Sequence, residues 1–150
     1  MFSIAFMRQN EESFLEAVQT GLEFFGGAPR RSIFDNAKVG VKEGFGKYAK
    51  TQDRYEELAA HYAFRTDFCN PSEGQEKGLV ENLVEYDRNN FLVPVPSVES
   101  LAELNRTLTE KCFTYNSTHK IRDREFTVAQ MLETSRKALI HLPPHCYDTS

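Results

Sequence analysis

The fold of this chain is decided around the stretch FFGGAPRRSIFDN, residues 24–36. Apolar residues recur at helical spacing from 14 to 25, behind a good N-cap at Asn10 and two acidic residues that suit a helix start. Two glycines end that helix, and the proline after them prevents its continuation. A short strand is predicted over residues 31–34, so Asp35 should stand at the end of a strand.

The rest of the chain is predicted to alternate between helices and strands up to residue 91 and to be helical beyond it. Helices are expected over residues 52–63, 77–91, 97–115 and 127–139, strands over 1–6 and 64–68, and an extended segment over 37–42. Ser97 is the expected N-cap of the helix 97–115, and Val84 is expected to be buried. This order fits an α/β core over residues 1–92 followed by a helical extension over 93–150.

Composition places the chain among ordinary globular proteins. Its 150 residues include 40% apolar and 27% charged residues, enough for one domain with a core. No segment approaches the roughly 20 apolar residues that a membrane span needs, so no membrane partner is expected. The three cysteines are far apart and odd in number, which predicts free thiols and a cytoplasmic protein.

Charge is distributed unevenly. The net charge of −4 argues against DNA binding by the whole surface. Between residues 29 and 50, however, six cations face two acids, a local balance of +4. The cations are Arg30, Arg31, Lys38, Lys42, Lys47 and Lys50, and the acids are Asp35 and Glu43. This stretch is interpreted either as a surface that neutralises DNA phosphates or as a solvated charged face.

Asp35 and Glu81 are the candidate catalytic and metal-binding pair. Glu81 lies in KGLVEN, residues 77–82, in the first turns of a predicted helix. Mg²⁺ takes oxygen ligands and is often held by one or two carboxylates plus phosphate. Two alternatives remain open: Asp35 followed by Asn36 is also a common turn pair, and Glu81 is spaced for an i,i+4 ion pair with Lys77. Lys77 is equally suited to contact a DNA phosphate.

Several short blocks resemble the IstA-type insertion-sequence transposases, in the order that this family shows. The blocks are FFGGAP at 24–29, IFDNAK at 33–38, LAAHYAF at 58–64, KGLVE at 77–81, LAELN at 101–105 and LPPHCYD at 142–148. The resemblance implies an integrase catalytic core with an RNase H-like fold and a DDE triad, in which Asp35 is the second acid and Glu81 the third. It also implies Mg²⁺ or Mn²⁺ as cofactor. The implied partners are the DNA of the element ends and target, a transposase multimer and a helper ATPase. His61, within LAAHYAF, is interpreted as a structural histidine rather than a catalytic base.

The chain departs from the family pattern at its start. The family's first Asp and its N-terminal DNA-binding region have no counterpart before the FFGGAP block. We therefore expect a truncated or internal fragment with an incomplete RNase H-like fold, one strand edge left unpaired, and no activity by itself. Two other hypotheses are a non-catalytic remnant that serves as a folding or protein-interaction module, and a metal-dependent nuclease of the same fold.

Overall fold

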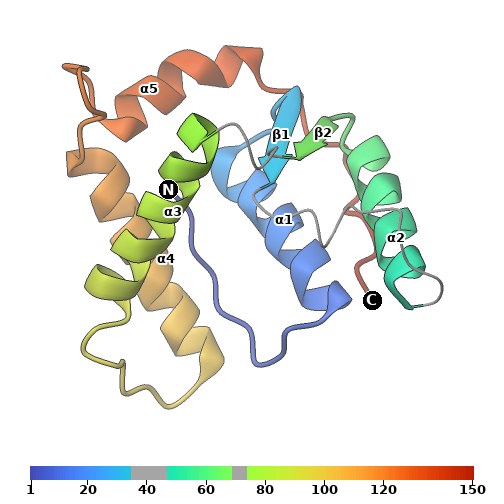
Figure 1. The fold of residues 1–150 in the computed structure, drawn as a ribbon, viewed down its shortest axis with the longest axis horizontal. Helices are drawn as coiled ribbons and strands as arrows, with labels where there is room; N and C mark the ends of the chain where they lie inside the picture. Colours follow the sequence, from blue (N-terminus) through green and yellow to red (C-terminus); the bar gives the residue numbers. More distant parts are fainter. Residues whose placement is uncertain (35–46, 69–73) are drawn as a thin grey trace. The chain divides into compact units, whose positions relative to one another are not determined.

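The structure is a computed structural model that describes residues 1–34, 47–68 and 74–150. Its elements are α1 (Glu11–Phe25), β1 (Arg31–Phe34), α2 (Lys47–His61), β2 (Arg65–Phe68), α3 (Gly74–Phe91), α4 (Leu101–Thr118), α5 (Val128–Ser135) and the 3₁₀ helix η2 (Arg136–Ala138). They are drawn in Figure 1. This mixture of helices and parallel strands confirms the predicted α/β class, whereas the RNase H-like topology stays a prediction. The extended segment expected over 37–42 lies outside the described residues.

The chain forms two compact units. The strand unit contains Asn10–Val80 and Ala138–Ser150, and the helical unit contains Met1–Gln9 and Glu81–Lys137. Each end of the chain therefore belongs to a different unit. The division into domains 1–92 and 93–150 stays a prediction.

Helix α1 begins and ends where local sequence chemistry directs it. The Asn10 side chain accepts a hydrogen bond from the Ser13 amide at 2.9 Å, which satisfies one of the free amides of the first turn. Gly26 closes the helix in the left-handed region with φ of 77°, a conformation that glycine adopts without strain. The Gly27 amide then donates to the Leu22 carbonyl at 3.1 Å. Both predicted boundaries of α1 are confirmed.

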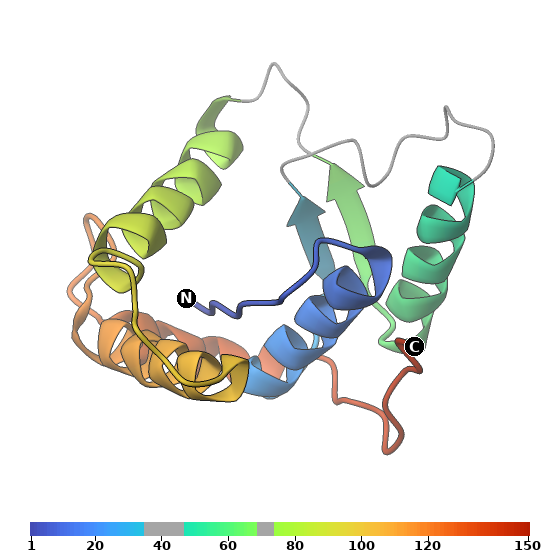
Figure 2. The same cartoon turned by 90° about the horizontal axis from the view of Figure 1, so that it is seen from below.

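Strands β1 and β2 form a two-stranded parallel sheet within the described residues. Arg31 pairs with Arg65 and Phe34 with Phe68, so both strands run in one direction and end together (Figure 2). The bounds predicted for the first strand are confirmed. One edge of this strand was expected to be unpaired, and among the described residues β2 pairs with only one of its edges.

The core of the strand unit is apolar and rich in aromatic rings. Leu15 of α1 and Leu58 of α2 are fully buried, and Tyr62 and Phe64 are almost so. Each fully buried leucine contributes about 1.5–3 kcal/mol of transfer free energy. These residues attach α1 and α2 to the short sheet, which a two-stranded ladder needs for stability.

The C-terminal segment, which contains the LPPHCYD block, is hydrogen-bonded to α2. Arg54 donates to the carbonyls of Asp148 and Ser150 at 3.1 and 3.0 Å. The Tyr147 hydroxyl donates to Glu57 at 2.9 Å, and His61 Nε2 lies 2.8 Å from the His145 carbonyl. The contacts of His61 are those of a structural histidine.

In the helical unit, residues 1–9 run along α4 (Figure 1). Asn105 exchanges two hydrogen bonds with the Ala5 backbone at 2.8 and 3.0 Å, and Asn116 bonds both the amine and the carbonyl of Met1. The strand expected over residues 1–6 is wrong, because asparagine side chains rather than a neighbouring strand satisfy this backbone.

Three local predictions in the helical unit are corrected. Helix α4 begins after Ser100, not Ser97, because the Ser100 hydroxyl accepts from the Glu103 amide at 3.1 Å. The helix expected over 127–139 ends at Ser135 and continues as η2. Val84 is 47% exposed rather than buried. It lies about 200° around α3 from Tyr86, whose ring faces α4.

Candidate functional site

The candidate site begins at the carboxyl end of β1. Phe34, its last residue, packs its ring against Phe14 of α1 and Tyr55 of α2, with centroid separations of 5.9 and 5.3 Å. This contact holds the strand end against both helices. Asp35 is the next residue in the chain, so the prediction that it follows a strand agrees with the bounds of β1. Asp35 and Lys38 themselves lie outside the described residues.

The neighbouring strand adds an acidic residue that sequence reasoning did not single out. Asp67 of β2 pairs in register with Ile33, one position before the strand ends. Its carboxylate forms a salt bridge with Arg31, and the two side chains are 37% and 47% exposed. The signal for Asp67 was present in the predicted strand 64–68, where it is the acidic residue, between Thr66 and Phe68.

The side chain of Tyr55 connects α2 to β2 through a hydrogen bond. Its hydroxyl lies 2.8 Å from Thr66 Oγ1, and its ring is 3% exposed. Burial raises the pKa of Tyr55 to about 12, and the hydrogen bond with Thr66 opposes part of that rise. The phenol is therefore neutral at ordinary pH, where it serves as a hydrogen-bonding anchor in the core.

The two arginines predicted to contact DNA lie at the amino end of β1. Arg30 is exposed, and its carbonyl accepts from the Arg65 amide at 3.0 Å. Arg31 is engaged by Asp67. At about 3.3 Å per residue, the strand separates Arg31 from its last residue, Phe34, by roughly 10 Å. Their role in DNA contact stays a prediction, as does that of Lys38.

Glu81 lies on α3 with an exposed side chain. Lys77 precedes it by four residues on the same helix, and the side chain of Lys77 is outside the described part of the structure. Helix placement of Glu81 agrees with the sequence prediction, although α3 begins at Gly74 rather than Lys77. Whether Asp35 and Glu81 approach each other stays a prediction. Within residues 1–34, 47–68 and 74–150, no three histidine, cysteine or acidic side chains gather as a metal site.

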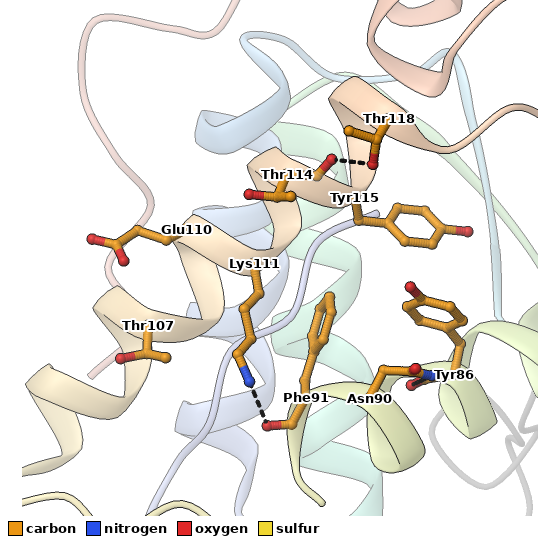
Figure 3. Close-up of a pocket in the computed structure, with 9 residues that line it drawn as sticks. All are labelled: Tyr86, Asn90, Phe91, Thr107, Glu110, Lys111, Thr114, Tyr115 and Thr118. Carbon is orange, nitrogen blue, oxygen red and sulfur yellow. Dashed lines mark hydrogen bonds between the residues drawn. The ribbon is translucent and has the colours of Figure 1, made fainter.

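A separate groove lies in the helical unit between α3 and α4. It has a volume of about 520 Å³, and Figure 3 shows aromatic rings and threonines along its walls. Tyr86 and Tyr115 approach with ring centroids 4.8 Å apart, and Lys111 Nζ donates to the Phe91 carbonyl at 3.2 Å. Glu81 is not among the residues that line this groove.

The structure defines a mixed α/β protein in which an acidic residue, Asp35, follows a parallel strand directly in sequence.

No protein-family model matches the chain. It is similar to a transposase of Aminobacter aminovorans, with 39% identity over 109 residues, 72% of this chain and 22% of that protein. It is also similar to the transposase for insertion sequences IS1326/IS1353 of Pseudomonas aeruginosa, with 33% identity over 140 residues, 93% of this chain and 28% of that protein.

A third relative is the transposase for insertion sequence element IS21 of Pseudomonas aeruginosa, 27% identical over 143 residues, 95% of this chain and 37% of that protein. The chain belongs to the insertion-sequence transposases, which confirms the resemblance found in its sequence blocks. It spans only 22% and 28% of the length of the first two relatives. No helix among the described residues has the length and apolar character to cross a membrane.

Proposed function

We propose that this chain supplies two acids, Asp35 and Glu81, to a transposase that cuts and joins DNA by metal-dependent phosphodiester chemistry. One observation carries the proposal: the match to the Pseudomonas aeruginosa transposase extends over 93% of the chain. The bounds of β1 add support, because they leave Asp35 directly after the strand and its last residue, Phe34, anchored on two helices. An integrase-like, RNase H-like topology is part of the same proposal.

In metal-dependent phosphodiester chemistry, the acidic side chains contribute mainly their position and their negative charge. Carboxylate oxygens are the ligands that hard divalent cations prefer, so the donor types of Asp35 and Glu81 fit Mg²⁺ or Mn²⁺. When bound, such ions stabilise the charge that develops on the attacking and leaving oxygens at phosphorus. The acids would hold that site in place, and a displacement of about 1 Å can reduce the rate by about 10²-fold.

Partners follow from the same proposal. The DNA of the element ends and of the target would be substrates, and a transposase multimer and a helper ATPase would be protein partners. We expect no specific cleavage or strand transfer by the 150-residue chain alone, because the family's first Asp has no counterpart in it. The alternative is a non-catalytic remnant that acts as a folding or protein-interaction module.

Metal binding tests the proposal directly. Titration of the 150-residue chain with Mn²⁺, followed by electron paramagnetic resonance of the free ion, should show weak binding. Asp35→Asn and Glu81→Gln should each abolish it. Glu133→Gln is the matched control, because Glu133 is an exposed acid that pairs with Arg136 at 3.5 Å, outside the proposed site.

Equal metal binding by the parent and both acid variants would place the ligands elsewhere, and absence of binding by the parent would favour the remnant. A second assay incubates the chain with end-containing DNA and Mn²⁺. A specific strand-transfer product that Asp35→Asn abolishes would reject the remnant and show that another residue supplies the third ligand.

A further inference from the structure

The connector between α4 and α5, residues 119–126, carries three cations within five positions. Its sequence is HKIRDREF, and Lys120, Arg122 and Arg124 are all exposed. In Figure 1 it is the orange segment that joins α4 to α5. The whole connector lies within the helical unit. It is also separate in sequence from the basic stretch 30–50.

The three cations are not neutralised by other described residues. None of them takes part in a salt bridge or a side-chain hydrogen bond within residues 1–34, 47–68 and 74–150. Asp123 and Glu125 lie in the same connector, and they too form no salt bridge with a described residue. The local balance is three positive against two negative charges, in a chain whose overall charge is −4. The positive side chains are therefore available to an anionic partner.

Backbone contacts hold the connector at both ends. The Val128 amide donates to the His119 carbonyl at 3.0 Å, and Lys120 and Thr127 form an isolated β-bridge. A capping box starts α5, in which Thr127 and Gln130 exchange hydrogen bonds. Within the connector, the Arg124 amide donates to the Ile121 carbonyl at 3.0 Å.

Side-chain stacking secures the first residue of the connector. The His119 ring stacks on Tyr115, with centroids 4.4 Å apart and an interplanar angle of 13°. Tyr115 in turn is buried on α4, so the stack joins the connector to the core of the helical unit. A loop fixed in this way loses less conformational entropy when it binds a ligand.

We propose that this connector is a DNA-contact surface on which Lys120, Arg122 and Arg124 bind backbone phosphates of a duplex. The inference rests on the proposed function, because it takes DNA as the anion that the chain meets. Arginine presents several donors that match phosphate oxygens, and lysine adds a point charge. Contacts of this kind position a protein on DNA without reading its sequence. The connector would therefore add affinity and register rather than target choice.

The test is the salt dependence of duplex binding by the 150-residue chain. Fluorescence anisotropy with a labelled duplex of arbitrary sequence gives the binding constant at a series of salt concentrations. The triple variant Lys120→Gln, Arg122→Gln, Arg124→Gln should bind more weakly. Each lost phosphate contact removes about 0.9 from the slope of log K against log salt, so the slope should shrink by about 2 to 3.

The matched control is the triple variant Arg8→Gln, Arg106→Gln, Lys137→Gln. These cations are also exposed in the helical unit, and both triple variants shift the net charge from −4 to −7. The control should change the slope by less than about 1. Circular dichroism of each variant shows whether the fold is retained.

Equal effects of the two triple variants would overturn the inference, since overall charge would then explain binding. An unchanged slope in the connector variant would also overturn it while leaving the acids and their metal chemistry untouched. Binding of polyglutamate through the connector in preference to DNA would indicate an acidic protein partner instead. Failure of the parent chain to bind DNA would reject the connector as a DNA surface, whereas the metal titration tests the proposed function separately.

Discussion

Tyr55 provides a sharp test of the packing beneath the candidate site. Its ring is 3% exposed, and burial raises its pKa from 10.0 to about 12. The folded chain therefore favours the neutral phenol more strongly than the unfolded chain does. This contribution to stability is fully present below pH 10 and is lost as the pH rises toward 12.

The magnitude follows from the size of the pKa shift. The parent should lose about 1.4 kcal/mol of unfolding free energy per pH unit in this window, and about 2 to 3 kcal/mol in all. Tyr55→Phe keeps the ring and cannot ionise, but it removes the 2.8 Å hydrogen bond with Thr66. That loss costs about 0.5–1.5 kcal/mol at about pH 8. The variant should therefore be less stable than the parent at about pH 8 and more stable above about pH 11.

Urea unfolding followed by circular dichroism, repeated across this pH range, measures the difference between parent and variant. Thr66→Val is the control, because it removes the same hydrogen bond but leaves Tyr55 able to ionise. It should retain the steep loss of stability at high pH. Parallel pH profiles for the parent and Tyr55→Phe, with no crossing, would refute the claim that burial raises the pKa of Tyr55.

Two further predictions concern packing in the strand unit and on α3. Gly27→Ala should lower the unfolding free energy, because a Cβ there would stand 2.7 Å from Leu139 Cβ. Gly78→Ala should be neutral or stabilising by up to about 1 kcal/mol, since the added Cβ would have no atom of another described part of the chain within 4 Å. The melting temperatures of the two variants measure this difference. An equal fall in melting temperature for both variants would contradict the close approach at Gly27. Leu58→Ala should lose about 2–5 kcal/mol in urea unfolding because Leu58 is fully buried. Leu79→Ala, at a position 66% exposed, should lose little, and similar costs for both leucines would contradict the observed core.

Local signals predicted much of the secondary structure. Asn10 and Gly26 mark the two ends of α1 because their side-chain and backbone chemistry act within a few residues. The four residues of β1 were predicted as the short strand that follows the helix-ending glycines and Pro29. The free thiols expected for the cysteines are confirmed for Cys112 and Cys146, while Cys69 lies outside the described residues. The family followed from the order of short sequence blocks, which requires no knowledge of tertiary contacts.

Other features of the site depend on residues distant in sequence. Residue periodicity could not show that Arg31 pairs with Asp67, because that salt bridge arises from the parallel register of β1 and β2. The local sequence pattern also led to a wrong strand prediction for the segment before α1. There Asn105, a hundred residues away, forms hydrogen bonds with the Ala5 backbone in place of a neighbouring strand.

The sequence by itself determined the two ends of α1, the bounds of β1, the α/β class and the membership of the transposase family. These depend on short-range backbone chemistry or on residue identity at ordered positions. Tertiary structure alone decided which face of α3 meets α4, and therefore that Val84 is exposed. Tertiary structure also decided that the LPPHCYD block forms hydrogen bonds with Arg54 and Glu57 of α2. Hydrogen bonds and burial between distant segments depend on how the chain packs, and local patterns carry no record of those pairings.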